Sequence, residues 1–400
     1  MKVTQVYQLL NNAFSEVTGQ TDLVAEDLTN VVDIGEKVFT NQELLDKYVA
    51  SLINHIGKVV FVDRPYEGQA PSVLMDGWEY GSILEKISAG LPESKVNETW
   101  GGAGQGLVNG TEYNPNIFHA PPAPRVKFFN QMDTYAIDIS FGRKQVRQSF
   151  SSATQLNAFF SMLEGKVAMR RTIDYDNLIA RTINNMIAGT IYNAYGSDYE
   201  STIATSSKAR AVNLLYLYKQ INPETKVTAQ NCLYDLGFIK FAAYTMALYS
   251  DRLEKASTLF NCGGQVRFTP KKLQKFIMLS EFKKAADVYL QSDTFHNEFT
   301  KLPAAESVTY WQGSGQTYGF SQTSGIHINT KNPDNDTTIE VATSGILGCL
   351  FDRDALGVNN VENRVYSKFN EVGEFYTNFY KNDARYFNDY DENFIVFFVA

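Results

Sequence analysis

A glycine-rich segment at residues 101–106, GGAGQG, is the first stretch whose composition could do chemistry. Glycines let backbone amides approach an anion, so such a segment could bind a phosphate group. Gly102, Gly104 and Gly106 do not give the GxGxxG spacing, and no Lys-Ser or Lys-Thr pair follows them. We therefore interpret the segment as the tip of a hairpin and predict no bound cofactor.

Metal ligands and nucleophiles lack the spacing that their chemistry requires. No HxxxH or HExxH pair occurs, so the sequence predicts no metal site. Neither Ser314 nor Ser324 lies in a GxSxG motif, and no cysteine stands near a histidine in a known signature. We predict no catalytic residue, and we interpret each histidine as an isolated surface or core residue: His55, His119, His296 and His327.

Several acidic groups also invite a metal-binding interpretation. Asp334 and Asp336 resemble the start of a calcium loop, but the required glycine and closing glutamate are missing. The remaining groups are most simply turn carboxylates: Asp352 with Asp354, and Asp389 with Asp391 and Glu392.

The charge balance is acidic and argues against a protein that binds nucleic acid by neutralising phosphates. Its 36 Lys plus Arg and 44 Asp plus Glu give a formal charge of −8. No run of 18 apolar residues exists, so we predict no membrane span. The start MKVTQVYQLL lacks the order of a signal peptide, and we expect the chain to fold where it is made. We interpret the three isolated cysteines as reduced: Cys232, Cys262 and Cys349.

A long helix is predicted over residues 154–187, with Thr154 in the N-cap position. At 1.5 Å per residue it would be about 50 Å long. Its first half carries one apolar stripe: Leu156, Phe159, Phe160, Leu163 and Val167. In its second half the stripe restarts on a rotated face: Met169, Ile173, Ala180, Ile183 and Ile187. The helix should therefore bury two faces against two partners.

The N-terminal third reads as an arm, a helix and a long hairpin. Residues 1–39 are sparsely apolar, residues 40–56 form a capped helix, and a short strand starts at Lys58. An outgoing strand starts at Trp78, and the alternating residues 135–141 form its return strand. Such a hairpin is only marginally stable alone, so it needs a surface to lie on.

The rest of the chain is predicted to contain both helices and strands. Helices are predicted near residues 214–221, 233–253 and 281–290, and buried strands at 273–279 and from Gly345. Residues 302–338 are rich in Gly, Ser, Thr and Asn and are predicted as surface loops. Residues 364–400 are dense in aromatics, and the apolar run NFIVFFVA must enter a sheet, because an exposed one would aggregate.

This order of elements resembles the major capsid proteins of tailed bacteriophages, which have the Hong Kong 97 type fold, and in particular those of phages of Gram-positive bacteria. Four segments carry the resemblance: EYGSILEKISAGLPESK from Glu79, RVKFFNQMDTYAIDISFGRKQVRQSFSS from Arg125, TSGILGCLFDRDALGV from Thr343, and ENFIVFFVA. The fold class expected is α+β.

The resemblance implies a division of the chain: N-terminal arm 1–39, helix and strand of the peripheral domain 40–75, extended loop 76–140, peripheral domain with the spine helix 141–204, axial domain 205–350, and strands returning to the peripheral domain 351–400. The extended loop would contact the next subunit through its apolar residues: Trp78, Tyr80, Ile83, Leu84 and Ile87.

The resemblance also implies a function. The protein would assemble as hexamers and pentamers into an icosahedral virion shell around double-stranded DNA, inside the host bacterial cytoplasm, with a separate scaffolding protein and a portal and without sequence-specific DNA binding or a membrane. Some relatives cross-link through a loop lysine, for which Lys86 and Lys95 are candidates. Two alternatives stay open, an encapsulin nanocompartment of the same fold and a cytosolic enzyme with an unrecognised site.

Overall fold

The computed structural model describes residues 70–75, 84–92, 124–142, 153–291, 305–312, 319–335 and 337–400. The predicted arm, the helix at 40–56, the strand at Lys58 and the glycine-rich segment lie outside these residues. The described helices are η1 Pro71–Val73, α5 Ala153–Tyr195, α6 Tyr199–Thr202, α7 Leu214–Ile221, η3 Cys232–Tyr234, α8 Leu236–Arg252, η4 Lys271–Leu273, α9 Ser280–Gln291 and α10 Phe320–Thr323. The strands are β1 Leu84–Ala89, β2 Pro124–Phe129, β3 Met132–Gly142, β4 Ala211–Asn213, β5 Gln274–Leu279, β6 Glu306–Val308, β7 Ile326–Lys331, β8 Thr338–Thr343, β9 Ile346–Asp352, β10 Leu356–Asn370, β11 Phe375–Asn388 and β12 Phe394–Phe398.

A five-stranded sheet forms the centre of the body, in the order β4-β12-β9-β5-β6. Strand β12 is parallel to β4 and antiparallel to β9, and all its residues are buried. Because side chains alternate along a strand, Val396 and Phe398 pack in the core with α5, whereas Ile395 and Phe397 pack in the core with α8. The prediction that the apolar C-terminal run enters a sheet is confirmed.

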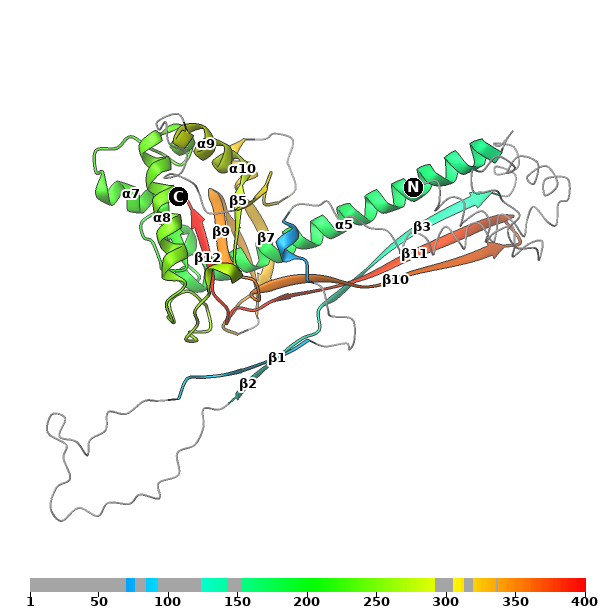
Figure 1. Ribbon diagram of the computed structural model, residues 1–400, viewed down its shortest axis with the longest axis horizontal. Helices are drawn as coiled ribbons and strands as arrows, with labels where there is room; N and C mark the ends of the chain where they lie inside the picture. Colours follow the sequence, from blue (N-terminus) through cyan, green and yellow to red (C-terminus); the bar gives the residue numbers. More distant parts are fainter. Residues whose placement is uncertain are drawn as a thin grey trace, which may run out of the picture.

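Helix α5 is longer than predicted, because its buried face continues past residue 187. Ile191 is fully buried, and the helix ends only at Gly196, whose φ of +80° suits glycine. At 1.5 Å per residue its 43 residues make a rod of roughly 65 Å. Figure 1 shows the rod leaving the body and running beside the long strands β3, β10 and β11.

The rotated apolar face predicted for the second half of α5 is partly wrong. Ile183 and Ile187 are buried, but Met169 and Ile173 are exposed. The buried face at this level is polar instead. Arg171 donates to Asn363 Oδ1 over 2.8 Å, and the Tyr175 hydroxyl donates to Asn382 Oδ1 over 2.9 Å. Asn363 on β10 and Asn382 on β11 therefore accept hydrogen bonds from two polar side chains that this helix buries. The burial of the predicted stripe residues from Leu156 to Leu163 is not among the described features of this helix.

A second sheet has three strands, in the order β10-β11-β3. The strand predicted at residues 135–141 is confirmed, and so is its alternation. The predicted pairing of this strand with the outgoing strand is wrong. Strand β3 pairs with β11 instead, and Ile137 lies opposite Tyr380. The outgoing strand β1 pairs with β2 instead. The physical reason is length, since β11 offers β3 a ladder along its full 11 residues.

The prediction of loops over residues 302–338 is wrong in part. Strands β6 and β7 lie there, and Trp311 is buried, its indole N–H donating to Ile346 O over 2.9 Å. The helices predicted after residue 205 and the strands at β5 and β9 are confirmed. Within the described residues, no helix is long and apolar enough to cross a membrane.

All three cysteines are free. Burial raises the pKa of the Cys232 thiol to about 12 and that of Cys262 to about 11, and it raises the pKa of Cys349 as well. These thiols therefore stay protonated at neutral pH, and the buried Cys232 and Cys349 are also shielded from reagents.

Candidate interaction surface on the β1–β2 ribbon

Strands β1 and β2 form a two-stranded antiparallel ribbon that extends away from the body (Figure 1). Residues that lie opposite each other in the register share a face, and successive residues alternate between faces. We call one side the outer face: Glu85, Ile87 and Ala89 with Pro124, Val126 and Phe128. The other side is the inner face: Leu84, Lys86 and Ser88 with Arg125, Lys127 and Phe129.

The outer face presents large apolar side chains to solvent. Ile87 is 68% exposed, Phe128 63% and Val126 43%, and Ile87 lies directly opposite Val126. A contiguous apolar patch on a projecting element is typical of a surface that binds another protein. The ribbon therefore offers a contact surface.

The structure places only some of the predicted contact residues. Trp78, Tyr80 and Ile83 lie outside the described residues. Ile87 is on the exposed outer face, whereas Leu84 is half-buried on the inner face.

Two further outer-face residues, Val126 and Phe128, escaped the sequence analysis. Their signal was the alternation in PRVKFF, where Arg125 and Lys127 separate the apolar side chains. That pattern predicts a strand with one apolar face.

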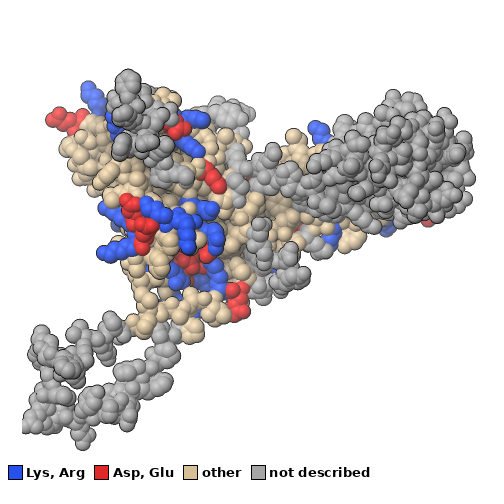
Figure 2. Space-filling model, viewed as in Figure 1, with Lys and Arg blue, Asp and Glu red and all other residues tan. Residues whose placement is uncertain are grey.

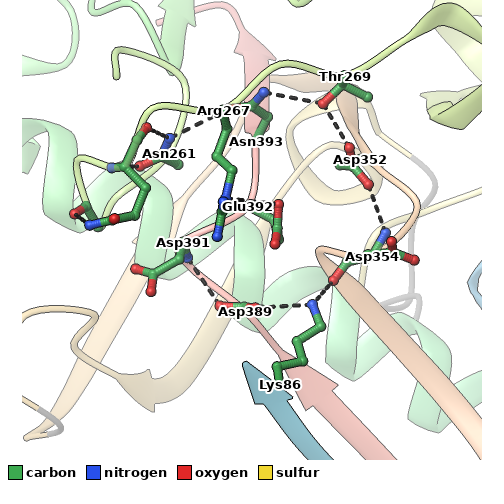
Figure 3. Close-up of polar contacts among 12 residues, drawn as sticks. Lys86, Asn261, Arg267, Thr269, Asp352, Asp354, Asp389, Asp391, Glu392 and Asn393 are labelled. Atoms are coloured by element: carbon green, nitrogen blue, oxygen red, sulfur yellow. Dashed lines mark hydrogen bonds and ion pairs between the residues drawn. The ribbon is translucent and has the colours of Figure 1, made fainter. Parts of the chain in front are cut away.

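The inner face is attached to the body by ion pairs. Lys86 and Lys127 lie opposite each other in the register and converge on Asp389, in the turn between β11 and β12. Lys86 Nζ is 3.0 Å from Asp389 Oδ2, and Lys127 Nζ is 3.1 Å from Asp389 Oδ1 and 2.7 Å from Asp391 Oδ2. We call these four residues the ionic latch; Figure 3 shows Lys86 pointing at Asp389.

The latch perturbs the acidity of its members. Burial would raise the pKa of Asp389, but the charges of Lys86 and Lys127 outweigh it and lower the pKa below its ordinary value. Burial would lower the pKa of Lys127, but Asp389 and Asp391 outweigh it and raise the pKa. Both pKa shifts favour the charged forms, so Asp389 and Lys127 are ionised at neutral pH.

Aromatic contacts surround the latch. Lys86 Nζ lies 5.2 Å from the centroid of the Phe387 ring, and Phe129 packs against the same ring with centroids 5.3 Å apart. A cation over an aromatic face is attracted by the ring quadrupole. The ribbon root therefore contacts β11 through both charge and apolar area.

A chain of hydrogen bonds continues from the latch into the body (Figure 3). Lys86 also donates to Asp354 O, and the Asp354 amide donates to Asp352 Oδ1. Thr269 donates to Asp352 Oδ2 over 2.8 Å, and Asn393 donates to Thr269 Oγ1 over 3.1 Å. The prediction of turn carboxylates is wrong for Asp352, which ends strand β9 because its residues pair with β5, whereas Asp354, Asp389, Asp391 and Glu392 lie in the connections between strands. The structure brings these distant segments together.

No group of three or more His, Cys, Asp or Glu in the described residues could hold a metal ion. His55, His119, His296 and Ser314 lie outside the description. His327 is exposed, with Nε2 2.6 Å from Glu340 Oε1, and the Ser324 hydroxyl donates to Phe320 O. Neither arrangement contains a nucleophile and its base.

A projecting ribbon with an apolar face is typical of a protein that contacts other proteins. Comparison with known families says which kind of protein this is. The model of a family described as Phi29-like phage major capsid protein matches residues 10–398. The chain belongs to this family, so it is a capsid shell protein of a bacteriophage and not an enzyme. The nanocompartment and enzyme alternatives are not favoured.

Solved structures were also compared. Similar chains include one from the capsid of Staphylococcus phage Andhra (10% identity, 85% of this chain and 87% of that chain, TM-score 0.46). A chain from the capsid of cyanophage P-SCSP1u has 10% identity and a TM-score of 0.42, and the match covers 86% of this chain and 94% of that chain. A chain from the mature capsid of bacteriophage PhiM1 has 7% identity and a TM-score of 0.41, and the match covers 80% of this chain and 82% of that chain. The curated proteins include no match.

Proposed function

We propose that this capsid protein has the Hong Kong 97 type architecture and assembles as hexamers and pentamers into an icosahedral shell that encloses double-stranded DNA. In this proposal the ribbon is the root of the extended loop, and α5 is the spine helix of the peripheral domain. The block of α7, α8, α9 and the five-stranded sheet then corresponds largely to the axial domain.

The observation that carries the proposal is the outer face of the ribbon. A two-stranded ribbon has no core of its own, and this one exposes Ile87, Val126 and Phe128. In a shell built of identical copies, the surface that covers these residues belongs to the next copy. Burying them there offsets the cost of ordering the ribbon.

The proposed partners follow from the shell. Copies of the chain supply the hexamers and pentamers, and assembly in the host bacterial cytoplasm uses a separate scaffolding protein and a portal. The formal charge of −8 supports confinement of the DNA by a closed shell rather than by phosphate contacts from each subunit.

The test is assembly of a variant with Ile87→Asp and Phe128→Asp, co-expressed with the scaffolding protein and viewed by electron microscopy. We expect folded subunits and no closed shells, because two carboxylates would lie in the contact. Tyr234→Ser is the matched control, since it removes an exposed apolar side chain from the body. Normal shells from the double variant would contradict the proposal.

A further inference from the structure

We propose that Asp389 is a positioning residue for assembly, which holds the ribbon in one direction relative to the body before its outer face meets another copy. Lys86 and Lys127 are the groups through which it acts. The inference rests on the proposed function, in which the outer face binds the next subunit.

The geometry of the latch constrains rotation. One ion pair would let the ribbon pivot about a single point, but here each strand contributes one lysine at the same level of the register. Both lysines reach the same carboxylate, one at each oxygen, over 3.0 and 3.1 Å. The ribbon is therefore held at two points across its width.

The acceptor is itself fixed to the body. The Asp389 side chain is only 4% exposed, and its Oδ1 accepts a hydrogen bond from the Asp391 amide over 3.1 Å. Its own amide donates to Ala355 O over 2.7 Å. The turn that carries it leads directly into β12, the buried strand of the body sheet. The direction of the ribbon is therefore fixed relative to the core of the body.

The charges around Asp389 come from several elements. Lys86 and Lys127 face it from the ribbon, and Asp391 shares Lys127. Glu392 in the same turn interacts with the charges of Asp389, Lys86, Asp352 on β9 and Arg267, and Arg267 Nε lies 3.5 Å from Glu392 Oε2. The backbone carbonyl of Asp354, after β9, accepts a hydrogen bond from Lys86. Figure 2 shows basic and acidic side chains intermingled on this face of the body above the ribbon.

Holding the ribbon in advance has two consequences for assembly. A preordered ribbon loses less conformational freedom when it binds, so more of the contact energy appears as affinity. It also presents its outer face at a set angle, and the angle between neighbouring subunits decides whether a shell closes.

The test measures the direction of the ribbon in the unassembled full chain. Spin labels are attached at Ala89→Cys on the ribbon and Lys255→Cys on the body, with Cys262→Ser to remove the partly exposed thiol. Pulsed electron resonance then gives the distribution of label distances. We expect a narrow distribution for the parent, a broader one for Lys86→Met or Lys127→Met alone, because the remaining lysine lets the ribbon pivot, and a severalfold broader one for the double variant. A double variant as narrow as the parent would overturn the inference.

A further variant separates positioning from general stability. The double lysine variant leaves a buried carboxylate without a cation, which destabilises the fold. Adding Asp389→Asn should restore the thermal midpoint but leave the distance distribution broad. If the distribution narrowed again together with the recovered stability, the latch would be only a stabilising contact, and the inference would be wrong.

The outcome can be told apart from failure of the proposed function. The variant with Ile87→Asp and Phe128→Asp keeps the latch, so its distance distribution should stay narrow while assembly is lost. Normal shells from that variant would contradict the proposed function. The width of the label-distance distribution in the lysine variants would still decide whether the latch orders the ribbon.

Discussion

At the scale of single residues, the ionic latch explains why buried charges are retained in this protein. Asp389 is nearly inaccessible, yet its pKa is lowered, because two lysines outweigh the cost of burial. Glu392, three residues along, has the opposite shift: burial raises its pKa, and Arg267 only partly opposes this. Neighbouring carboxylates in one turn therefore respond to acid in opposite senses.

Acid should weaken the fold through Asp389. A carboxyl whose folded pKa is lowered contributes stability above its unfolded pKa of about 4 and loses it as pH falls through the folded pKa. We expect the thermal midpoint of Asp389→Asn to depend less on pH between about 5 and 3 than that of the parent. Glu392→Gln is the matched control and should make the acid decline steeper. Equal slopes for all three proteins would contradict the assignment of these shifts.

The latch could not have been found from the sequence. Lys86, Lys127 and Asp389 are separated by long stretches of chain, and each looks like an ordinary surface charge. The contact residues of the outer face were partly predictable, because a strand that alternates apolar and charged residues reveals its two faces locally. Which face would be free was not predictable, since it depends on where the ribbon leaves the body.

At the scale of elements, helices with one apolar face and fully apolar strands were predictable from the sequence, whereas polar strands were not. The helices α7, α8 and α9 and the strands β5, β9 and β12 have apolar patterns that fix their type. Strand β10 carries Asn359, Asn360 and Asn363 and shows no such pattern. Asn363 bonds Arg171 on α5 and Arg364 pairs with Asp383 on β11, and these partners come together only in the folded state. Sequence patterns record burial of apolar groups and miss polar burial that depends on tertiary contacts.

The close packing of α5 against the turn before β12 gives a prediction at this scale. A Cβ on Gly189 would lie 2.4 Å from the Tyr390 hydroxyl oxygen, which donates to Asn185 O over 3.0 Å. We expect Gly189→Ala to lower the free energy of unfolding by about 1 to 3 kcal/mol, because Tyr390 must move. The measurement is denaturant unfolding of the unassembled protein.

Gly165 on the same helix is the control, since no atom of the described residues lies within 4 Å of its added Cβ. Gly165→Ala should raise the free energy of unfolding by roughly 0.5 to 1 kcal/mol, through lower backbone entropy of the unfolded chain. If both substitutions lowered the free energy of unfolding, the predicted contrast between the two positions would be wrong, and contact with Tyr390 would not be the reason that Gly189→Ala destabilises the protein.

At the scale of the whole molecule, body and ribbon have separate tasks. The body has its own core on both faces of the five-stranded sheet, and the ribbon has none. Removal of the segment that connects β1 to β2 should therefore leave the body folded.

The register shows where to shorten the ribbon. Ala89 lies opposite Pro124, so residues 90–123 can be replaced by an Asn-Gly turn. We expect a thermal midpoint close to that of the parent and loss of normal shells, measured by calorimetry and by electron microscopy of co-expressed scaffold and subunit. The double substitution at the outer face provides the comparison, and closed shells of ordinary size from the shortened chain would refute the division of tasks.

The position of β12 also sets a condition on synthesis. It lies between β4, some 180 residues earlier in the chain, and β9, so the sheet of the body cannot close until residue 398 has left the ribosome. A nascent chain that stops before residue 394 leaves two strand edges open and cannot complete either core. Assembly-competent subunits therefore arise only after translation has passed this strand, which keeps truncated products out of the growing shell.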